Sequence, residues 1–166
     1  LAQSFARLGS NVTLIEMAAR IMIREDAEVS DLVQASFEAD GIRVLTDHKA
    51  VRCGVTEAEK WIEVVHENAT RKIAFDEMIV AVGRSPRLKG FGLEQLGIET
   101  GRVVETNAYL ETLYPNILAA GDVAGPYQFT HIAGHQAWFA TINALFGGVK
   151  RFKADYRVIP WATFTD

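Results

Sequence analysis

Cysteine is nearly absent from the sequence: Cys53 is the only one, so no disulfide can form within the chain. This excludes a secreted scaffold stabilised by disulfides. No apolar run approaches the ~20 residues that a membrane-spanning helix needs, and no signal peptide is indicated at the first residues. Basic residues form no block and the net charge is −4. We therefore expect a cytoplasmic globular protein with neither nucleic acid nor membrane as a partner.

The composition is that of an ordinary globular domain, with 49% hydrophobic and 23% charged residues in a chain of 166. That length is sufficient for one domain with a sizeable core. The chain starts at Leu1, within a segment of helical character, so we expect it to be a piece of a longer protein.

A short apolar run, Ile117–Ala120, follows a Pro-Asn turn and is too short for a helix. It predicts a fully buried strand of a parallel sheet. The run ends at Gly121-Asp122, which places a carboxylate at the carboxyl end of a strand, where open α/β sheets bind ligands. The alternative is that Asp122 only caps the following turn.

The first sixteen residues have the pattern of half a βαβ unit. Leu1–Leu8 is predicted to be a helix that stops at Gly9, and residues 11–15 are predicted to form a strand that ends at Glu16. A nucleotide-binding unit of this kind also needs a first strand and a glycine-rich turn, which we expect before Leu1. Without them, Glu16 is either a ribose-binding carboxylate or a solvated strand end.

The middle of the chain alternates between predicted helix and strands. A helix capped by Asp26 extends to about Asp40, with four residues at helical spacing facing a core: Val29, Leu32, Val33 and Phe37. A strand is predicted at residues 42–45, and an antiparallel meander at residues 50–56, 61–66 and 72–75. Cys53 lies in the meander and is interpreted as inert, and His48 and His66 as surface residues without a ligand-spaced partner.

Two further segments end in features typical of binding sites. Met78–Val82 predicts an apolar strand that runs into Gly83-Arg84, and a short helix and turn are predicted at residues 93–98. A second long helix is predicted from about Thr130 to Gly147-Gly148, and its first N–H groups suit an electron-rich ligand. His131 and His135 share a face of this helix, but a metal site lacks a third ligand at a motif spacing.

Three motifs carry a resemblance to a known family. They are T-x-x-P-N-I-x-A-x-G-D-V at residues 112–123, L-A-x-x-F-A-R-L-G-x-x-V-T-L-I-E at residues 1–16 and A-x-G-R-x-P at residues 81–86. Together they resemble the pyridine nucleotide-disulfide oxidoreductases, the family of dihydrolipoamide dehydrogenase and mercuric reductase. The resemblance covers nearly the whole chain, yet only the middle of the family's length.

The resemblance implies an α/β fold in which three domains are represented. Residues 1–82 correspond to a Rossmann-like NAD(P)-binding domain, with a parallel sheet and an antiparallel β-meander, that lacks its first strand and glycine turn. Residues 83–150 correspond to the second part of the FAD-binding domain. Residues 151–166 correspond to the start of the interface domain, whose exposed Trp161 and Phe164 are expected to pack on another copy or be poorly ordered.

The resemblance also assigns cofactor roles by position. Asp122, with Gly121, binds a hydroxyl of the FAD ribityl chain, and Glu16 binds the adenosine ribose, which favours NAD over NADP. Gly83 allows close approach of the nicotinamide nucleotide, whereas Arg84 either serves the cofactors or braces the crossover. The start of the second long helix binds the flavin pyrimidine edge through three residues: Phe129, Thr130 and His131.

The implied activity of the parent protein is hydride transfer from a nicotinamide cofactor to FAD, and then to a disulfide or another small-molecule substrate, in a homodimer. We identify no catalytic residue and no metal ligand in the chain, so the fragment alone is expected to be inactive. The alternatives are a flavoprotein of the NADH oxidase or ferredoxin reductase type, and a non-catalytic nucleotide-binding module. A Cys-x-x-x-x-Cys pair upstream would exclude the former, and a genuine start codon near Leu1 would favour the latter.

Overall fold

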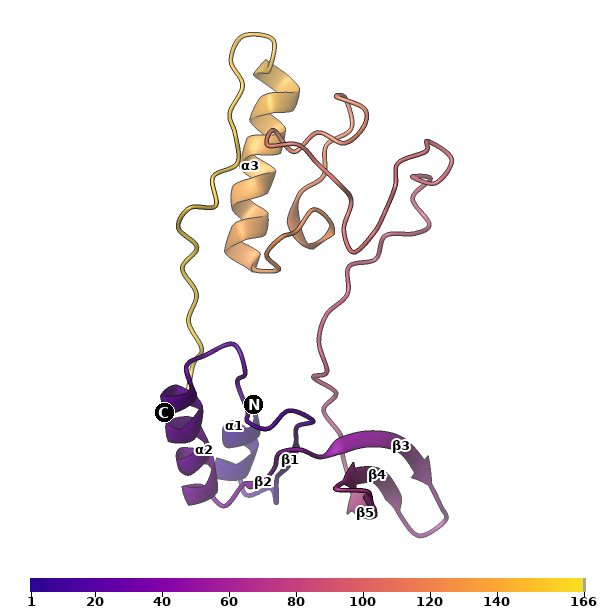
Figure 1. Cartoon of the computed structure of the whole chain (residues 1–166), viewed down its shortest axis with the longest axis vertical. Helices are drawn as coiled ribbons and strands as arrows, with labels where there is room; N and C mark the ends of the chain where they lie inside the picture. Colours follow the sequence, from indigo (N-terminus) through magenta and orange to yellow (C-terminus); the bar gives the residue numbers. More distant parts are fainter. Residues whose placement is uncertain (166) are drawn as a thin grey trace. The chain divides into compact units, whose positions relative to one another are not determined.

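The computed structural model describes residues 1–165 and divides the chain into two compact units (Figure 1). One unit comprises residues 1–80 together with 163–165, and the other comprises residues 81–162. Asp166, the last residue of the predicted interface segment, lies outside the described residues.

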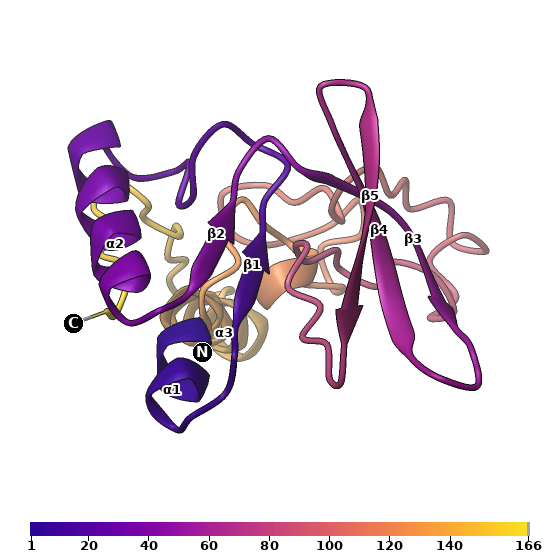
Figure 2. The same ribbon diagram turned by 90° about the horizontal axis from the view of Figure 1, so that it is seen from below.

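The first unit contains the predicted half of a βαβ arrangement. Its elements are α1 (Ala2–Arg7), β1 (Thr13–Ile15), α2 (Ala27–Ala39) and β2 (Arg43–Leu45). β1 and β2 pair in parallel with Thr13 opposite Arg43, and Figure 2 shows the two strands side by side. Parallel strands need a crossover connection, here supplied by α2, which contacts β2. The predicted α/β character is confirmed.

Glycine ends α1 as predicted. Gly9 has φ +96°, its N–H donates to the carbonyl of Ala6, and the N–H of Ser10 donates to the carbonyl of Phe5. These bonds satisfy carbonyl groups that the end of a helix otherwise leaves without partners. The chain can therefore turn directly from α1 into β1.

The two helices of this unit are joined by polar contacts. The Gln3 side-chain amide donates to Ser36 Oγ and, at 2.9 Å, to Asp40 Oδ2, and Arg7 forms an ion pair with Asp40. The Gln3 hydrogen bond, followed by the hydrogen bond from Arg7, holds the pKa of the Asp40 carboxyl below its usual value. Gln3 thus connects the start of α1 to the end of α2.

The prediction for α2 is only partly correct. Asp26 occupies the N-cap position, but its side chain makes no capping hydrogen bond. Val33 is buried as predicted, whereas Leu32 is 73% exposed and Val29 is also exposed. The prediction that all four apolar residues of this helix face a core is therefore wrong for Val29 and Leu32. The structure buries Ser30 instead, since its hydroxyl donates to the carbonyl of Ile21.

The meander is confirmed as a three-stranded antiparallel sheet, in the order β3 (Lys49–Val55), β4 (Lys60–His66) and β5 (Ala69–Phe75). Glu67 and Asn68 both have positive φ, which is the two-residue hairpin geometry that matches strand twist. Val64, at the centre of β4, is fully buried. The other residues of β4 are half-buried, apart from the exposed Lys60, so the alternation that predicted this strand does not separate a core face from a solvent face.

Two predicted strands, one of them expected in a parallel sheet, do not form. Residues 78–82 are irregular, with Ile79, Val80 and Val82 exposed. Residues 117–120 are half-buried rather than fully buried, and their only ladder contact is an isolated antiparallel bridge between Leu118 and Glu111. A parallel strand needs a neighbouring strand to satisfy its backbone groups, and neither segment has one among the described residues.

The second unit is built on one long helix, α3 (Thr130–Phe146), and loops that pack on it. The predicted helix at residues 93–98 is a hydrogen-bonded turn. Buried hydrophobic side chains of this unit are Ile98, Val104, Leu110, Ala124 and Ile132. No helix among the described residues is long and apolar enough to span a membrane.

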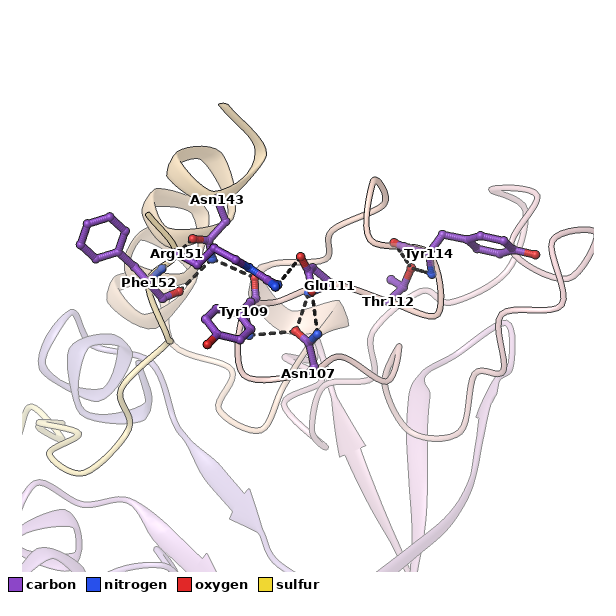
Figure 3. Close-up of polar contacts among 8 residues, drawn as sticks. All are labelled: Asn107, Tyr109, Glu111, Thr112, Tyr114, Asn143, Arg151 and Phe152. Carbon is purple, nitrogen blue, oxygen red and sulfur yellow. Dashed lines mark hydrogen bonds and ion pairs between the residues drawn. The ribbon is translucent and has the colours of Figure 1, made fainter. Parts of the chain in front are cut away.

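Asn143 on α3 holds two distant loops together (Figure 3). Its amide donates to the carbonyls of Tyr109 and Phe152, and its oxygen accepts the N–H of Phe152 at 2.8 Å. Arg151 forms an ion pair with Glu111 and lies 3.9 Å from the Tyr109 ring centroid. The segment after α3 is therefore attached to both the helix and the loop around residue 110.

A glycine in the meander generates the first prediction. A Cβ on Gly54 would overlap the ring of Trp61 on the neighbouring strand, so the ring occupies the space of the missing side chain. We expect Gly54→Ala to lower the free energy of unfolding by about 1–3 kcal/mol, as overpacking does. Thermal or urea unfolding measures this.

The matched control is the double variant Gly54→Ala/Trp61→Leu. Because the clash requires both groups, the Gly54 substitution should cost much less when Trp61 has already been replaced. An equal cost in the two backgrounds would show that the Trp61 ring is not the reason for this glycine.

Candidate functional site

The predicted Gly-Asp pair lies in a short 3-10 helix, η1 (Gly121–Val123), which follows the extended residue Ala120. Gly121 is buried and has φ +81°, a conformation that residues with a Cβ adopt at a cost. A Cβ on this residue would also lie 3.4 Å from Ala133 of α3. Glycine at this position thus allows η1 to pack closely on the helix.

A buried glutamine holds this turn in place. Gln136 on α3 is 0% exposed, and its side-chain oxygen accepts the N–H of Gly121 at 2.6 Å. Its amide nitrogen donates to the carbonyl of Gly125 at 2.6 Å and to the hydroxyl of Tyr156 at 2.8 Å. Sequence reasoning missed Gln136. No clear signal was available, because the helical segment also carries His135, Thr141 and Asn143.

The structure brings Arg84 and Asp122 together. The guanidinium lies 3.4 Å from the Asp122 carboxylate, whose side chain is 33% exposed. This distance is longer than that of a strong charge-assisted hydrogen bond, so the carboxylate retains capacity to accept further hydrogen bonds. Gly83, next to Arg84, has φ +120° and open space around its Cα. Arg84 is therefore placed to orient Asp122.

The start of α3 lies in the same unit. Phe129 occupies the N-cap position. The first hydrogen bond of the helix runs from the N–H of Ala133 to the carbonyl of Phe129, at 2.9 Å. The N–H groups of Thr130 and His131 therefore have no acceptor within the helix. The Phe129 ring stacks nearly parallel on His131, at 5.4 Å between centroids, and on Trp161, at 6.4 Å.

The two histidines of α3 lie in different environments. His131 stacks on Phe129, whereas the edge of His135 meets the ring of Phe139 at 4.5 Å between centroids. The described residues contain no group of three His, Cys, Asp or Glu side chains with the geometry to hold a metal ion.

The segment after α3 carries a well-defined ion pair. The Arg157 side chain donates to both carboxylate oxygens of Asp155. The Arg157 backbone N–H donates to Oδ1 of the same carboxylate. These hydrogen bonds, of which the side-chain bonds have the largest effect, lower the pKa of Asp155 to about 2. The Asp155 carboxylate in turn raises the pKa of Arg157. Beyond this pair, Val158 and Trp161 are exposed.

Glu16 lies in the other unit, at the carboxyl end of β1 as predicted. Its backbone continues the parallel ladder, with its N–H donating to Leu45 and its carbonyl accepting the N–H of His48. Its carboxylate accepts the N–H of Ala18 at 2.8 Å. The loop that follows is fixed by Arg20, whose guanidinium donates to the Glu25 carbonyl and the Ser30 hydroxyl. The Glu16 side chain is half-buried.

The fold and these turns define a class of protein. A parallel βαβ half-unit with a carboxylate at its strand end, together with a glycine-aspartate turn beside a helix N-terminus, is the arrangement of a nucleotide-binding α/β protein. The family model for pyridine nucleotide-disulphide oxidoreductases matches residues 1–137, most of the chain. The chain therefore belongs to this family, as the sequence motifs predicted.

Individual relatives agree. A mercuric reductase from Staphylococcus aureus is 34% identical over 170 residues, covering 100% of this chain and 30% of the relative. A dihydrolipoyl dehydrogenase from Bacillus subtilis strain 168 is 37% identical over 148 residues, covering 88% of this chain and 32% of the relative. The chain thus spans about a third of the length of these two relatives.

Solved structures show the same similarity. The HOCl-induced flavoprotein disulfide reductase RclA from Escherichia coli, as the Cu(II) complex of a mutant, superposes with a TM-score of 0.83 and 30% identity, covering 98% of this chain and 36% of RclA. LpdA from Mycobacterium tuberculosis superposes with a TM-score of 0.81 and 25% identity, covering 94% of this chain and 33% of LpdA.

Gln136 provides the prediction for this site. In Gln136→Leu the N–H of Gly121 and the carbonyl of Gly125 lose a buried partner, so we expect a loss of about 2–4 kcal/mol in unfolding free energy. Tyr156→Phe removes only one partner of the glutamine and should cost about 1 kcal/mol. Denaturant unfolding of both variants measures the difference; equal, small effects would contradict a central role for Gln136.

Proposed function

We propose that this chain is the cofactor-binding middle part of an FAD- and NAD-dependent oxidoreductase that passes electrons to a disulfide or dithiol. In this proposal residues 1–82 belong to the NAD-binding domain, residues 83–150 to the FAD-binding domain and residues 151–166 to the interface domain. The observation that carries the proposal is the glycine-aspartate turn that Gln136 fixes beside the start of α3, in a chain of this family.

The side chains of the turn and the helix suit FAD in their hydrogen-bonding character. Asp122 offers a partly exposed carboxylate, which accepts hydrogen bonds from the hydroxyls of a ribityl chain. The free N–H groups at Thr130 and His131, with Phe129 before them, suit an electron-rich ring edge at the positive end of the helix dipole. Gly121 is proposed to contribute by letting the turn pack on α3, since the space of its missing side chain faces Ala133.

Glu16 is the proposed NAD contact in the first unit. A carboxylate at the end of the second strand of a dinucleotide-binding unit accepts hydrogen bonds from ribose hydroxyls, and its charge repels a 2′-phosphate. NADP is therefore the less favoured cofactor. Gly83, with open space around it, is proposed to allow approach of the nicotinamide end. Arg84 is proposed to orient Asp122 rather than to contact substrate.

The flavin, when bound, accepts a hydride from the nicotinamide and passes two electrons onward. The residues of this chain bind and orient these cofactors; none is proposed to react. Cys53, the single cysteine, is exposed on β3 and has no second thiol in the chain, so disulfide chemistry requires cysteines outside it. The chain alone is proposed to be inactive, and the substrate of the whole protein to be a disulfide or another small molecule.

The whole protein is further proposed to be a cytoplasmic homodimer. Support for the dimer comes from the apolar side chains of Val158 in one unit and Phe164 in the other, which are each largely exposed and can be covered by a partner. Support for the location is limited to the single cysteine, which is typical of a reducing compartment.

Asp122 tests the flavin site. In the full-length protein, Asp122→Ala should weaken FAD binding by about tenfold or more, because a hydrogen bond to a charged group contributes about 1.5–3 kcal/mol. The flavin content of the purified variant and an FAD titration measure this. Asp155→Ala, which removes another partly exposed carboxylate of the same unit, is the control and should retain normal flavin affinity. Equal flavin affinity in both variants would contradict the assignment.

Glu16 tests the dinucleotide site. Glu16→Ala should raise the Kd for NADH by about fivefold or more through loss of ribose hydrogen bonds. It should also reduce the preference for NADH over NADPH, because the repulsive charge is gone. Titration of the full-length protein with each cofactor measures both effects, with Glu57→Ala in the exposed β3–β4 turn as the control. An unchanged preference would remove Glu16 from the site.

A further inference from the structure

Two histidines that the sequence presents as isolated surface residues lie against each other. His48, immediately before β3, and His66, the last residue of β4, stack with ring centroids 4.4 Å apart and planes 4° from parallel. Both rings are half-buried. Sequence spacing does not reveal this contact, because it arises from the antiparallel pairing of β3 with β4.

Each ring also holds the same turn of backbone. His48 Nδ1 lies 2.6 Å from the carbonyl oxygen of Thr46, and His66 Nδ1 lies 3.0 Å from that of Asp47. A carbonyl oxygen only accepts hydrogen bonds, so both Nδ1 atoms carry the proton and donate it. The turn of residues 46–48 is thus bound by two donors from two stacked rings.

The backbone of this turn is also hydrogen-bonded to the segment that contains Glu16. The N–H of His48 donates to the carbonyl of Glu16 at 3.0 Å, and the N–H of Asp47 donates to the carbonyl of Ala18 at 2.9 Å. The N–H of Ala18 in turn donates to the Glu16 carboxylate at 2.8 Å. The orientation of that carboxylate therefore depends on where the 46–48 turn holds Ala18.

The turn needs support to keep its conformation. Asp47 has φ +55°, in the left-handed region, where a residue with a Cβ persists only when its surroundings hold it. The hydrogen bond from His66 to the Asp47 carbonyl supplies such support from a different strand. The nearby Glu67 carboxylate lies 4.0 Å from His66 Nε2 and is largely exposed, so it is a weak competitor for the ring.

We propose that His48 and His66 are positioning residues of the dinucleotide site: the stacked pair holds the 46–48 turn, and the turn fixes the Glu16 carboxylate that meets the ribose. This inference rests on the proposed NAD-binding function of Glu16. In this proposal neither histidine touches the cofactor. His66 bonds the carbonyl of Asp47, and the N–H of Asp47 bonds the carbonyl of Ala18, so the pair affects NAD affinity through the backbone.

Two substitutions of His66 separate the hydrogen bond from the ring. His66→Phe keeps an aromatic ring and removes the Nδ1 donor, whereas His66→Asn keeps a donor near the Nδ1 position and removes the ring. In the full-length protein we expect His66→Phe to raise the Kd for NADH about fivefold, which corresponds to one ordinary hydrogen bond, and His66→Asn to stay within about twofold of the parent. The rate of flavin reduction at saturating NADH should be unchanged in both.

A second variant acts on the strained residue. Because glycine adopts positive φ without cost, Asp47→Gly should restore much of the NADH affinity in the His66→Phe background. If His66→Phe does not yield folded protein, His66→Ala replaces it, with the same expectation of weak binding and of rescue by Asp47→Gly. His135→Asn, a histidine of α3, is the control and should leave NADH affinity unchanged.

The outcomes distinguish this inference from the proposed function. Weak NADH binding in Glu16→Ala and in His66→Phe, with His66→Asn near normal, supports both. Weak binding in Glu16→Ala with normal binding in His66→Phe, or equal losses in His66→Phe and His66→Asn, overturns the positioning role alone. Normal NADH affinity in Glu16→Ala overturns the dinucleotide assignment, and the inference with it.

Discussion

The buried amide of Gln136 is the interaction on which the second unit depends. It satisfies one donor and one acceptor of the chain between Gly121 and Gly125, and it also bonds the Tyr156 hydroxyl. An unpaired polar group at this depth is costly, so a single side chain fixes the η1 turn, the start of the loop before α3 and the segment after the helix. The position of Asp122 follows from this arrangement.

Strand formation, by contrast, depends on neighbours. The apolar runs 78–82 and 117–120 have the composition of buried parallel strands, yet they remain irregular or form a single bridge. Each strand leaves N–H and C=O groups that only a parallel neighbour satisfies, and the family relatives are about three times as long as this chain. The proposed cofactor-binding turns form without those strands because hydrogen bonds from Gln136 in the second unit, and to the Glu16 carboxylate in the first, hold them.

Sequence alone was sufficient for features that short-range chemistry determines. The stop of α1 at Gly9, the hairpin at Glu67-Asn68, the start of α3 near Thr130 and the place of Glu16 at a strand end all depend on residues within a few positions. It was insufficient for Gln136 and for the His48–His66 pair. Their partners lie 11–20 residues away or on another strand, and no local pattern encodes which polar groups such side chains meet.

The same contrast applies to the proposed cofactor contacts of this chain. α3 is apolar around most of its circumference, and Trp138, Leu145 and Phe146 are exposed on it, which is typical of a helix that is covered on more than one side. Yet the groups that orient Asp122 come from the covered side, through Gln136 and Ala133. In the first unit, Glu16 is likewise oriented by Ala18 and the 46–48 turn. In each unit the proposed cofactor contact is therefore fixed by a backbone turn bonded to the nearest packed element, and assembly of the remaining sheet can add affinity without having to create the site.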